Sequence, residues 1–234
     1  MVVLVTQKND PKKIIIALDY DDKKSVINLC DQLDPSHCRL KVGKQLFTKL
    51  GPDIIDLIHK KNFEIFLDLK FHDIPITVHK ACIEAYKLGV WMLNIHLLGG
   101  EEMIIAAKEA RDQANPSALL IGVTLLTSHN DKYLQTLGLT DRNSVVNKLA
   151  FLAHNCSIDG VVCSPADIMH IKNIASDFVY VTPGIRLNDQ TDDHAIIYTP
   201  KKAISAGSSY LVIGRPITQA KDPNSIVNKI RSLI

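Results

Sequence analysis

Short apolar runs alternate with longer amphipathic stretches along the whole chain. The apolar runs are bounded by polar or turn-forming residues, a pattern that predicts buried strands. We expect strands at residues 14–18, 38–42, 63–69, 90–95, 119–124, 160–163, 178–181 and 210–213. The stretches between them have apolar residues at helical spacing, which predicts helices. We expect helices at residues 22–33, 44–60 with an interruption at Gly51 and Pro52, 76–88, 101–113, 143–154, 165–174, 201–206 and 224–233.

This regular alternation of strand and helix predicts a parallel sheet and an α/β fold. Eight such units within 234 residues predict a closed (β/α)8 barrel, the TIM barrel. The alternative is an open, doubly wound sheet, but its glycine-rich turn after the first strand is missing, because residues 18–22 read Leu-Asp-Tyr-Asp-Asp. The sequence has no linker, repeat array or low-complexity tract. We therefore expect residues 1–234 to form a single domain.

Composition narrows the classes of function. The net charge is +2 and no basic run exceeds two residues, so we expect no nucleic-acid partner. The five cysteines are scattered without a C-x-x-C motif, which argues against a disulfide framework and a zinc site. The chain lacks a signal-peptide pattern and an apolar run of about 20 residues, the length of a membrane span. We expect a cytoplasmic protein with no membrane partner.

Charged residues follow the third expected strand. Side chains two residues apart share a face of a strand, so Asp68 and Lys70 should point the same way, and Asp73 lies three residues further on. One interpretation is a simple ion pair between Asp68 and Lys70. Two carboxylates and one ammonium leave net negative charge, however, which a structural ion pair does not need. A lysine held between carboxylates stays protonated and can act as a general acid.

Glycine and arginine follow the last two strands, as Gly184 and Arg186 and as Gly214 and Arg215. Loops after strands seven and eight commonly bind phosphate in such barrels. Gly214 allows the backbone to approach an anion, and Arg215 adds a permanently charged donor. Pro216 suits the first position of a short helix. The alternative is a glycine turn with a surface arginine. We expect a phosphate site at this end of the barrel, where polar residues from several strands converge.

Taken with these motifs, the chain resembles the orotidine 5′-phosphate decarboxylase family nearly from end to end. Asp-x-Lys-x-x-Asp alone is only moderately specific. It becomes highly specific when combined with Lys41, the segment His72-Asp73-Ile74-Pro75 and the two glycine–arginine loops. The matching segments are residues 16–19, 40–43, 66–75, 94–96, 122–128, 159–164, 182–186, 199–200 and 212–218.

The resemblance implies conversion of orotidine 5′-monophosphate to uridine 5′-monophosphate and CO2, the last step of UMP biosynthesis, without a metal or organic cofactor. It implies that Lys70 protonates C6 of the pyrimidine, that Asp68 lies against the substrate carboxylate and that Lys41 completes the charged array. It also implies a homodimer in which Asp73 joins the neighbouring subunit's site. The substrate contacts that it implies are Asp19, Lys41, Asp68, Ile74, Thr77, Thr127, Pro183, Arg186, His194, Gly214 and Arg215, with Ile74 and Thr77 coming from the partner.

One position departs from the family pattern. Family members usually have a glutamine shortly before the Thr-Pro pair at 199–200, and this glutamine bridges the phosphate and the base. His194 stands at that position here, and Gln190 lies four residues earlier. An imidazole N–H can still donate to phosphate. We hypothesise that the contact which closes over the substrate is weakened, with His194 or Gln190 making it.

Two other functions compete with this interpretation. A metal-dependent sugar-phosphate decarboxylase or aldol-type synthase of the same superfamily shares Asp-x-Lys-x-x-Asp, but such relatives usually carry a carboxylate where this chain has Lys41. A barrel that binds nucleotides without catalysis would not need Lys70 between two carboxylates. Loss of activity with a chelator would favour the first alternative, and nucleotide binding without turnover would favour the second.

Overall fold

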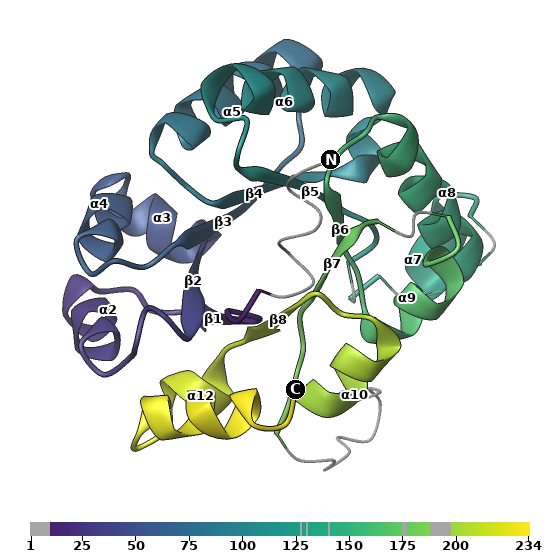
Figure 1. Ribbon diagram of the computed structural model, residues 1–234. Helices are drawn as coiled ribbons and strands as arrows, with labels where there is room; N and C mark the ends of the chain where they lie inside the picture. The colour runs from purple at the N-terminus through teal and green to yellow at the C-terminus, as the bar shows by residue number, and fades with distance from the viewer. Residues whose placement is uncertain (1–9, 127, 130, 140, 175–176, 188–197) are drawn as a thin grey trace.

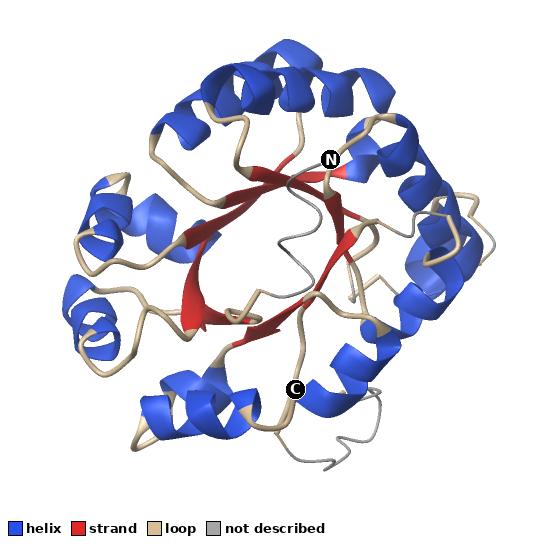
Figure 2. Ribbon diagram, viewed as in Figure 1, coloured by secondary structure: helices blue, strands red, loops and turns tan. Residues whose placement is uncertain are grey.

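The computed structural model describes residues 10–126, 128–129, 131–139, 141–174, 177–187 and 198–234. Eight parallel strands close into a barrel in sequence order, so the predicted (β/α)8 architecture is confirmed. Figure 2 shows the strands as an inner ring surrounded by helices. The strands are β1 (Ile14–Leu18), β2 (Cys38–Gly43), β3 (Ile65–Phe71), β4 (Met92–His96), β5 (Leu119–Val123), β6 (Gly160–Val162), β7 (Val179–Thr182) and β8 (Tyr210–Ile213).

The helices follow the expected order, with some differences in detail (Figure 1). The interruption expected at Gly51 and Pro52 is confirmed. It gives two helices, because Gly51 has a φ of +65° at the end of the first and Pro52 precedes the second. Helix α7 and the 3-10 helix η1 were not predicted. The helices are α2 (Lys23–Cys30), α3 (Lys44–Leu50), α4 (Asp53–His59), α5 (Pro75–Lys87), the 3-10 helix η1 (Leu97–Gly99), α6 (Glu101–Ala114), α7 (Asp131–Thr136), α8 (Arg142–Asn155), α9 (Pro165–Ile171), α10 (Pro200–Ala206), α11 (Arg215–Thr218) and α12 (Pro223–Arg231).

The strands separate two groups of buried side chains. The larger group lies between the sheet and the helices and includes Ile16 and Leu67. The smaller group, the inner cluster, contains side chains that point into the barrel: Ile15, Ala17, Phe66, Met92, Leu119, Ile121, Val179, Val181, Tyr210 and Val212. Alternating directions along each strand produce this division. The barrel interior is therefore a packed core rather than a pore.

A charged and aromatic floor lies at the end of the barrel where the strands begin. Arg39 is only 5% exposed and pairs with Asp10 at 2.8 Å and with Glu64 at 3.0 Å. Its guanidinium also stacks 3.9 Å from the centre of the Trp91 ring, while Tyr210 donates to Asp10 at 2.9 Å. These two carboxylates and the aromatic ring compensate for the cost of burying the Arg39 guanidinium. The floor leaves the opposite end of the barrel for ligands.

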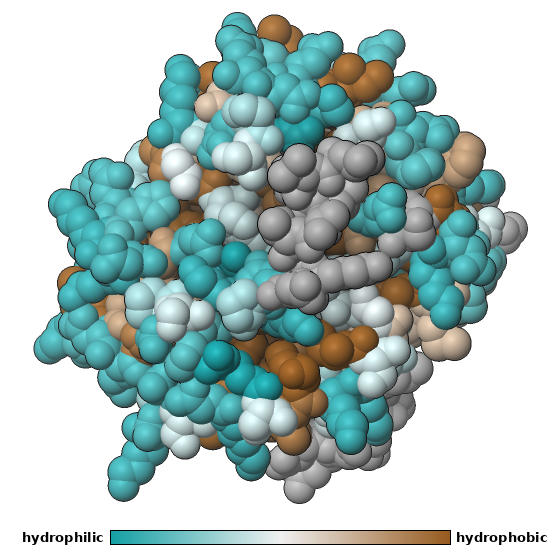
Figure 3. Space-filling view, viewed as in Figure 1, coloured by the Kyte–Doolittle hydropathy of each residue, from teal (hydrophilic) through white to brown (hydrophobic). Residues whose placement is uncertain are grey.

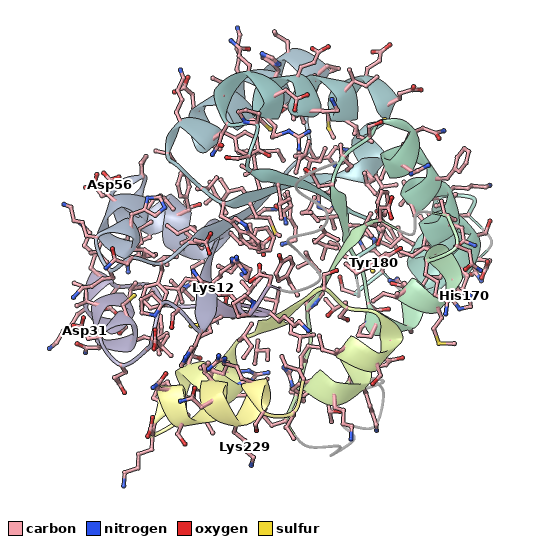
Figure 4. All side chains as sticks on the ribbon, in the orientation of Figure 1. Lys12, Asp31, Asp56, His170, Tyr180 and Lys229 are labelled. Atoms are coloured by element: carbon pink, nitrogen blue, oxygen red, sulfur yellow. The ribbon has the colours of Figure 1, made fainter. Side chains whose placement is uncertain are left out.

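The end of the barrel that faces the viewer in Figure 3 is largely hydrophilic around its rim, with apolar residues in smaller groups. Charged side chains such as Asp31, Asp56 and Lys229 extend from the periphery (Figure 4). Within the described part of the chain, no helix is both long enough and apolar enough to cross a bilayer.

Candidate active site

A cavity of about 380 Å³ opens at the carboxyl ends of the strands. Its apolar wall includes Phe66, Val123, Leu125, Val162 and Val212. Its polar lining consists of Asp19, Lys41, Asp68, Lys70, Asn94, Arg186 and Arg215, which come from strands on all sides of the barrel. The volume suits a small organic ligand, and the strand ends are where barrels of this type place their chemistry.

The centre of the charged lining is Asp68, near the end of β3. Its carboxylate Oδ2 lies 3.2 Å from Lys41 Nζ, and its Oδ1 accepts hydrogen bonds from Lys70 Nζ and, at 2.7 Å, from Asn94 Nδ2. Asp68 and Lys70 both line the cavity, while Leu69 between them packs on the outer core. The prediction that these two charged side chains share one face of the strand is confirmed.

The surroundings of Asp68 keep its carboxyl ionised. Burial is the largest single influence and raises the pKa of Asp68, but the ammonium groups of Lys41 and Lys70 and the hydrogen bonds from Lys70 and Asn94 together lower it more. The result is a pKa below the usual range for aspartate. Two lysines thus meet one buried carboxylate, and Lys41 Nζ also lies 3.9 Å from Asp19 Oδ1 at the mouth of the cavity.

The backbone of β3 is irregular where these side chains leave it. The pairing with β4 shifts between Leu67 and Phe71, and Lys70 has a φ of +51°. A positive φ is uncommon outside glycine and concentrates at functional sites. The sequence pattern predicted a regular strand here, so the irregularity is a finding of the structure.

The segment after β3 lies away from this cavity. Asp73 is exposed and its carboxylate accepts the N–H of Ile74 at 2.7 Å. Ile74 is itself 62% exposed, and Thr77 is exposed on the first turn of α5. The cavity lining of this single chain includes none of these three residues among those described.

The predicted phosphate loops border the other side of the cavity. Pro183, Gly184 and Arg186 follow β7, and Gly214 and Arg215 follow β8. Gly214 is close to the mouth, because a methyl group added to it would lie 3.4 Å from Asp19 Oδ2. Arg215 begins α11, with Pro216 in its first turn, as the sequence suggested. Thr127, His194 and Gln190 lie outside the described residues.

Asn94 was not among the predicted site residues. It is completely buried on β4 and hydrogen-bonded to both Asp68 and the Lys70 backbone. The sequence signals for it were its position near the end of a buried strand and its place in the matching segment 94–96.

Cys163 also lines the cavity, but burial raises the pKa of its thiol well above the usual value, so it is inert as a nucleophile. Burial lowers the pKa of His96 to about 4, with nearby His72, Lys44 and Lys70 adding to the effect. This histidine is neutral at physiological pH. No cluster of three metal-ligating side chains occurs among the residues that the structure describes.

Comparison with known proteins agrees with this geometry. Residues 12–230 match the family model described as "Orotidine 5'-phosphate decarboxylase / HUMPS family". An orotidine 5'-phosphate decarboxylase from Nitrosospira multiformis is 52% identical over 225 residues, covering 95% of this chain and 93% of the relative. One from Vibrio cholerae is 49% identical over 228 residues, covering 96% and 98%.

Two solved structures share the fold. The orotidine 5'-phosphate decarboxylase from Lactobacillus acidophilus superposes with a TM-score of 0.85 at 37% identity, covering 95% of this chain and 98% of the other. An uncharacterized conserved protein from Geobacillus kaustophilus gives a TM-score of 0.83 at 33% identity, covering 94% and 99%.

Proposed function

This chain belongs to the orotidine 5'-phosphate decarboxylase / HUMPS family, and from that premise we propose that it decarboxylates orotidine 5′-monophosphate to uridine 5′-monophosphate and CO2. That reaction is the last step of UMP biosynthesis. The observation that carries the proposal is the buried Asp68 carboxylate held between the ammonium groups of Lys41 and Lys70 at the base of the cavity.

Lys70 is the proton donor in this mechanism. When the bond between C6 and the carboxylate breaks, its electron pair stays on C6 and CO2 leaves. The Lys70 ammonium transfers a proton to C6, a C–H bond forms, and a neutral amine remains until water reprotonates it. A fixed ammonium beside C6 stabilises charge only as that charge develops, so it favours the transition state over the bound substrate.

Asp68 and Lys41 set the charge around that carbon. Asp68 keeps Lys70 protonated and lies against the departing carboxylate, which raises the energy of the bound substrate relative to the transition state. Lys41 balances the array and, with Asp19 3.9 Å away, binds the ribose hydroxyls. The ammonium groups of Lys41 and Lys70, on either side of Asp68, allow the Asp68 carboxylate and the substrate carboxylate to lie close together.

The phosphate binds at the opposite side of the cavity. Arg186, Arg215 and the backbone at Gly214 hold it, and Pro183 lines the pocket beside it. Binding energy far from the reacting carbon holds the pyrimidine in position over Lys70. Thr127 contacts the pyrimidine edge, and His194 or Gln190 bridges towards the phosphate.

The active form is a cytoplasmic homodimer that uses neither a metal nor an organic cofactor. Asp73, Ile74 and Thr77 enter the neighbouring subunit's site, where Asp73 joins the charged array. Their exposure, and the fact that none of them lines its own cavity, support this arrangement. Ile76, 56% exposed in the same segment, supports it too, because a pair of exposed isoleucines favours burial against another chain.

The test is to follow orotidylate decarboxylation by absorbance in excess chelator, comparing wild type with Lys70→Ala. Wild type should turn over undiminished, and the variant should lose at least about 10⁴-fold in kcat because it lacks both the acid and the stabilising charge. Lys44→Ala is the control, since Lys44 is an exposed lysine on α3 that does not line the cavity.

Three results would contradict different parts of this proposal. Full activity of Lys70→Ala would remove Lys70 as the acid. Loss of wild-type activity with chelator would favour the metal-dependent alternative. Tight binding of uridine 5′-monophosphate without any turnover would favour a nucleotide-binding barrel.

A further inference from the structure

The buried amide of Asn94 joins the two charged residues that do the proposed chemistry. Its Nδ2 donates to Asp68 Oδ1 at 2.7 Å, and its Oδ1 accepts the backbone N–H of Lys70 at 2.8 Å. Because the Lys70 N–H can only donate, the amide oxygen must face it and the amide nitrogen must face the carboxylate. Both ends of the Asn94 side chain are thus committed to the Asp68–Lys70 segment.

The break in strand pairing explains why a side chain is needed here. Leu67 pairs with Leu93 and Phe71 pairs with Ile95, so three residues of β3 lie opposite Asn94 alone. A bulge of this kind interrupts the backbone ladder and leaves groups unpaired. Asn94 supplies the acceptor for Lys70 with its side chain instead, and it does so where Lys70 has a φ of +51°. The amide therefore anchors a backbone conformation that needs outside support.

The second bond acts on the carboxylate. Asp68 Oδ1 accepts hydrogen bonds from both Lys70 Nζ and Asn94 Nδ2, while Oδ2 forms an ion pair with Lys41. When Lys70 gives its proton to C6, it becomes a neutral amine and a much weaker donor to Oδ1. The amide of Asn94 does not titrate. It remains a donor to the same oxygen throughout that step.

We propose that Asn94 is a positioning residue that keeps Asp68 and Lys70 aligned while the proton is transferred from Lys70 Nζ to C6. It touches neither the reacting carbon nor the phosphate loops and acts through the other two residues. The inference rests on the proposed decarboxylation. It goes further by assigning a role in the step to a neutral residue on a neighbouring strand.

Asn94→Asp provides a sharp test because it changes one bond and keeps the other. The new carboxylate can still accept the Lys70 N–H, but it cannot donate to Asp68, and it repels it. The charged groups that face this position are Lys41 from β2 and Asp68 and Lys70 from β3. We expect kcat at neutral pH to fall about 10- to 100-fold, as for loss of a hydrogen bond to a charged group.

The pH dependence distinguishes positioning from simple packing. Burial beside Asp68 raises the pKa of a carboxyl group at position 94. Once protonated, that group donates to Asp68 Oδ1 as the amide did. In Asn94→Asp, kcat at saturating substrate should therefore recover as the pH falls from 8 towards 5.5, whereas kcat of the wild type should stay flat.

Two further variants complete the test. Thr124→Val is the matched control: Thr124 is completely buried at the end of β5 and donates to Val162 O at 3.1 Å, without contacting the charged array. It should keep a flat profile and a kcat within about 3-fold of the wild type. Asn94→Ala, which serves if Asn94→Asp does not fold, should lose about 10- to 100-fold in kcat while its Kd for uridine 5′-monophosphate changes less than about 3-fold.

The outcomes separate this inference from the proposed function. If the wild type does not decarboxylate orotidylate, both fail. If the wild type is active and Asn94→Asp has a flat profile at wild-type kcat, only the role of Asn94 fails. A parallel loss of kcat and product affinity in Asn94→Ala would reduce Asn94 to a structural residue.

Discussion

Asp68 combines burial with a full negative charge. Burial raises the pKa of this carboxyl group, and the two ammonium groups together with the hydrogen bonds from Lys70 and Asn94 bring the pKa below its usual range. A group with a lowered pKa stays ionised until the pH falls through that pKa. Activity that depends on ionised Asp68 should therefore persist well into the acid range and be lost only at low pH.

Replacing Lys41 with methionine should move that acid limit. Lys41→Met removes the largest single interaction that lowers the pKa of Asp68, so this pKa rises and the acid limb of the kcat profile shifts towards neutral pH. We also expect a loss of about 10²- to 10³-fold in kcat at pH 7, as for other preorganised charges. A pH series of kcat at saturating substrate measures both effects.

Lys44→Met controls for removal of a lysine from the same region, because Lys44 is exposed and outside the cavity lining. Its profile should match the wild type. A profile for Lys41→Met with an unmoved acid limb would show that Lys41 does not control the ionisation of Asp68.

At the level of single residues, the sequence predicted the charged side chains of the site but not Asn94, which orients them. Asp68 and Lys70 were predictable because two-residue spacing on a strand puts them on one face, whereas Lys41 was expected from the family resemblance. Asn94 was not, because its role depends on a pairing shift between β3 and β4 that no periodicity encodes. Thr127 and His194 lie outside the described residues, so their roles stay predictions.

Among the elements, strands β6 and β7 approach each other closely at Gly160. A methyl group added there would lie 2.1 Å from the carbonyl oxygen of Val179 on the neighbouring strand β7. Real atoms do not approach that closely, so β6 and β7 pair here only because residue 160 has no side chain. Gly160 lies on the same strand as Val162, which lines the cavity.

Gly160→Ala should lower the free energy of unfolding by about 2–4 kcal/mol, because the backbone of β7 must move. Urea denaturation measures it. Gly138→Ala is the control: its φ is +69° but an added methyl meets nothing within 4 Å, so only the backbone cost of about 1 kcal/mol applies. Equal losses in the two variants would contradict a steric role for Gly160.

Elements were predicted best where hydrophobic periodicity is strong. All eight strands were found, because each has a buried apolar run. The helix over 44–60 was split by Gly51 and Pro52 into α3 and α4. Helices α7 and η1 escaped prediction because they have six and three residues, too few to show a period.

At the scale of the whole molecule, the exposed apolar residues near β3 and α6 support the proposed assembly of two subunits. Ile74 is 62% exposed and Ile76 56%, while Leu98 and Ile105 on the neighbouring elements η1 and α6 are each 39% exposed. In the proposed dimer this side of the barrel is covered by the partner. Dimer formation and a complete active site then depend on the same surface.

Ile74→Glu should therefore separate the subunits and reduce kcat at least about 100-fold, because a buried unpaired charge is costly and Asp73 no longer reaches a neighbouring site. Light scattering after size-exclusion chromatography gives the mass, and a decarboxylation assay at the same concentration gives kcat. Met169→Glu is the control, since Met169 is equally exposed at 64% but lies on α9. A monomeric, fully active Ile74→Glu protein would contradict the shared site.

The wall of strands between the two groups of buried side chains has a practical consequence for engineering. Side chains of the inner cluster and of the outer layer lie in separate groups, so changes in one layer and changes in the other should combine with nearly additive effects on stability. Directed evolution can then replace residues of the outer group, between the sheet and the helices, to raise thermal stability while leaving the residues inside the barrel unchanged. The fold therefore contains two groups of buried residues that can be mutated almost independently of each other.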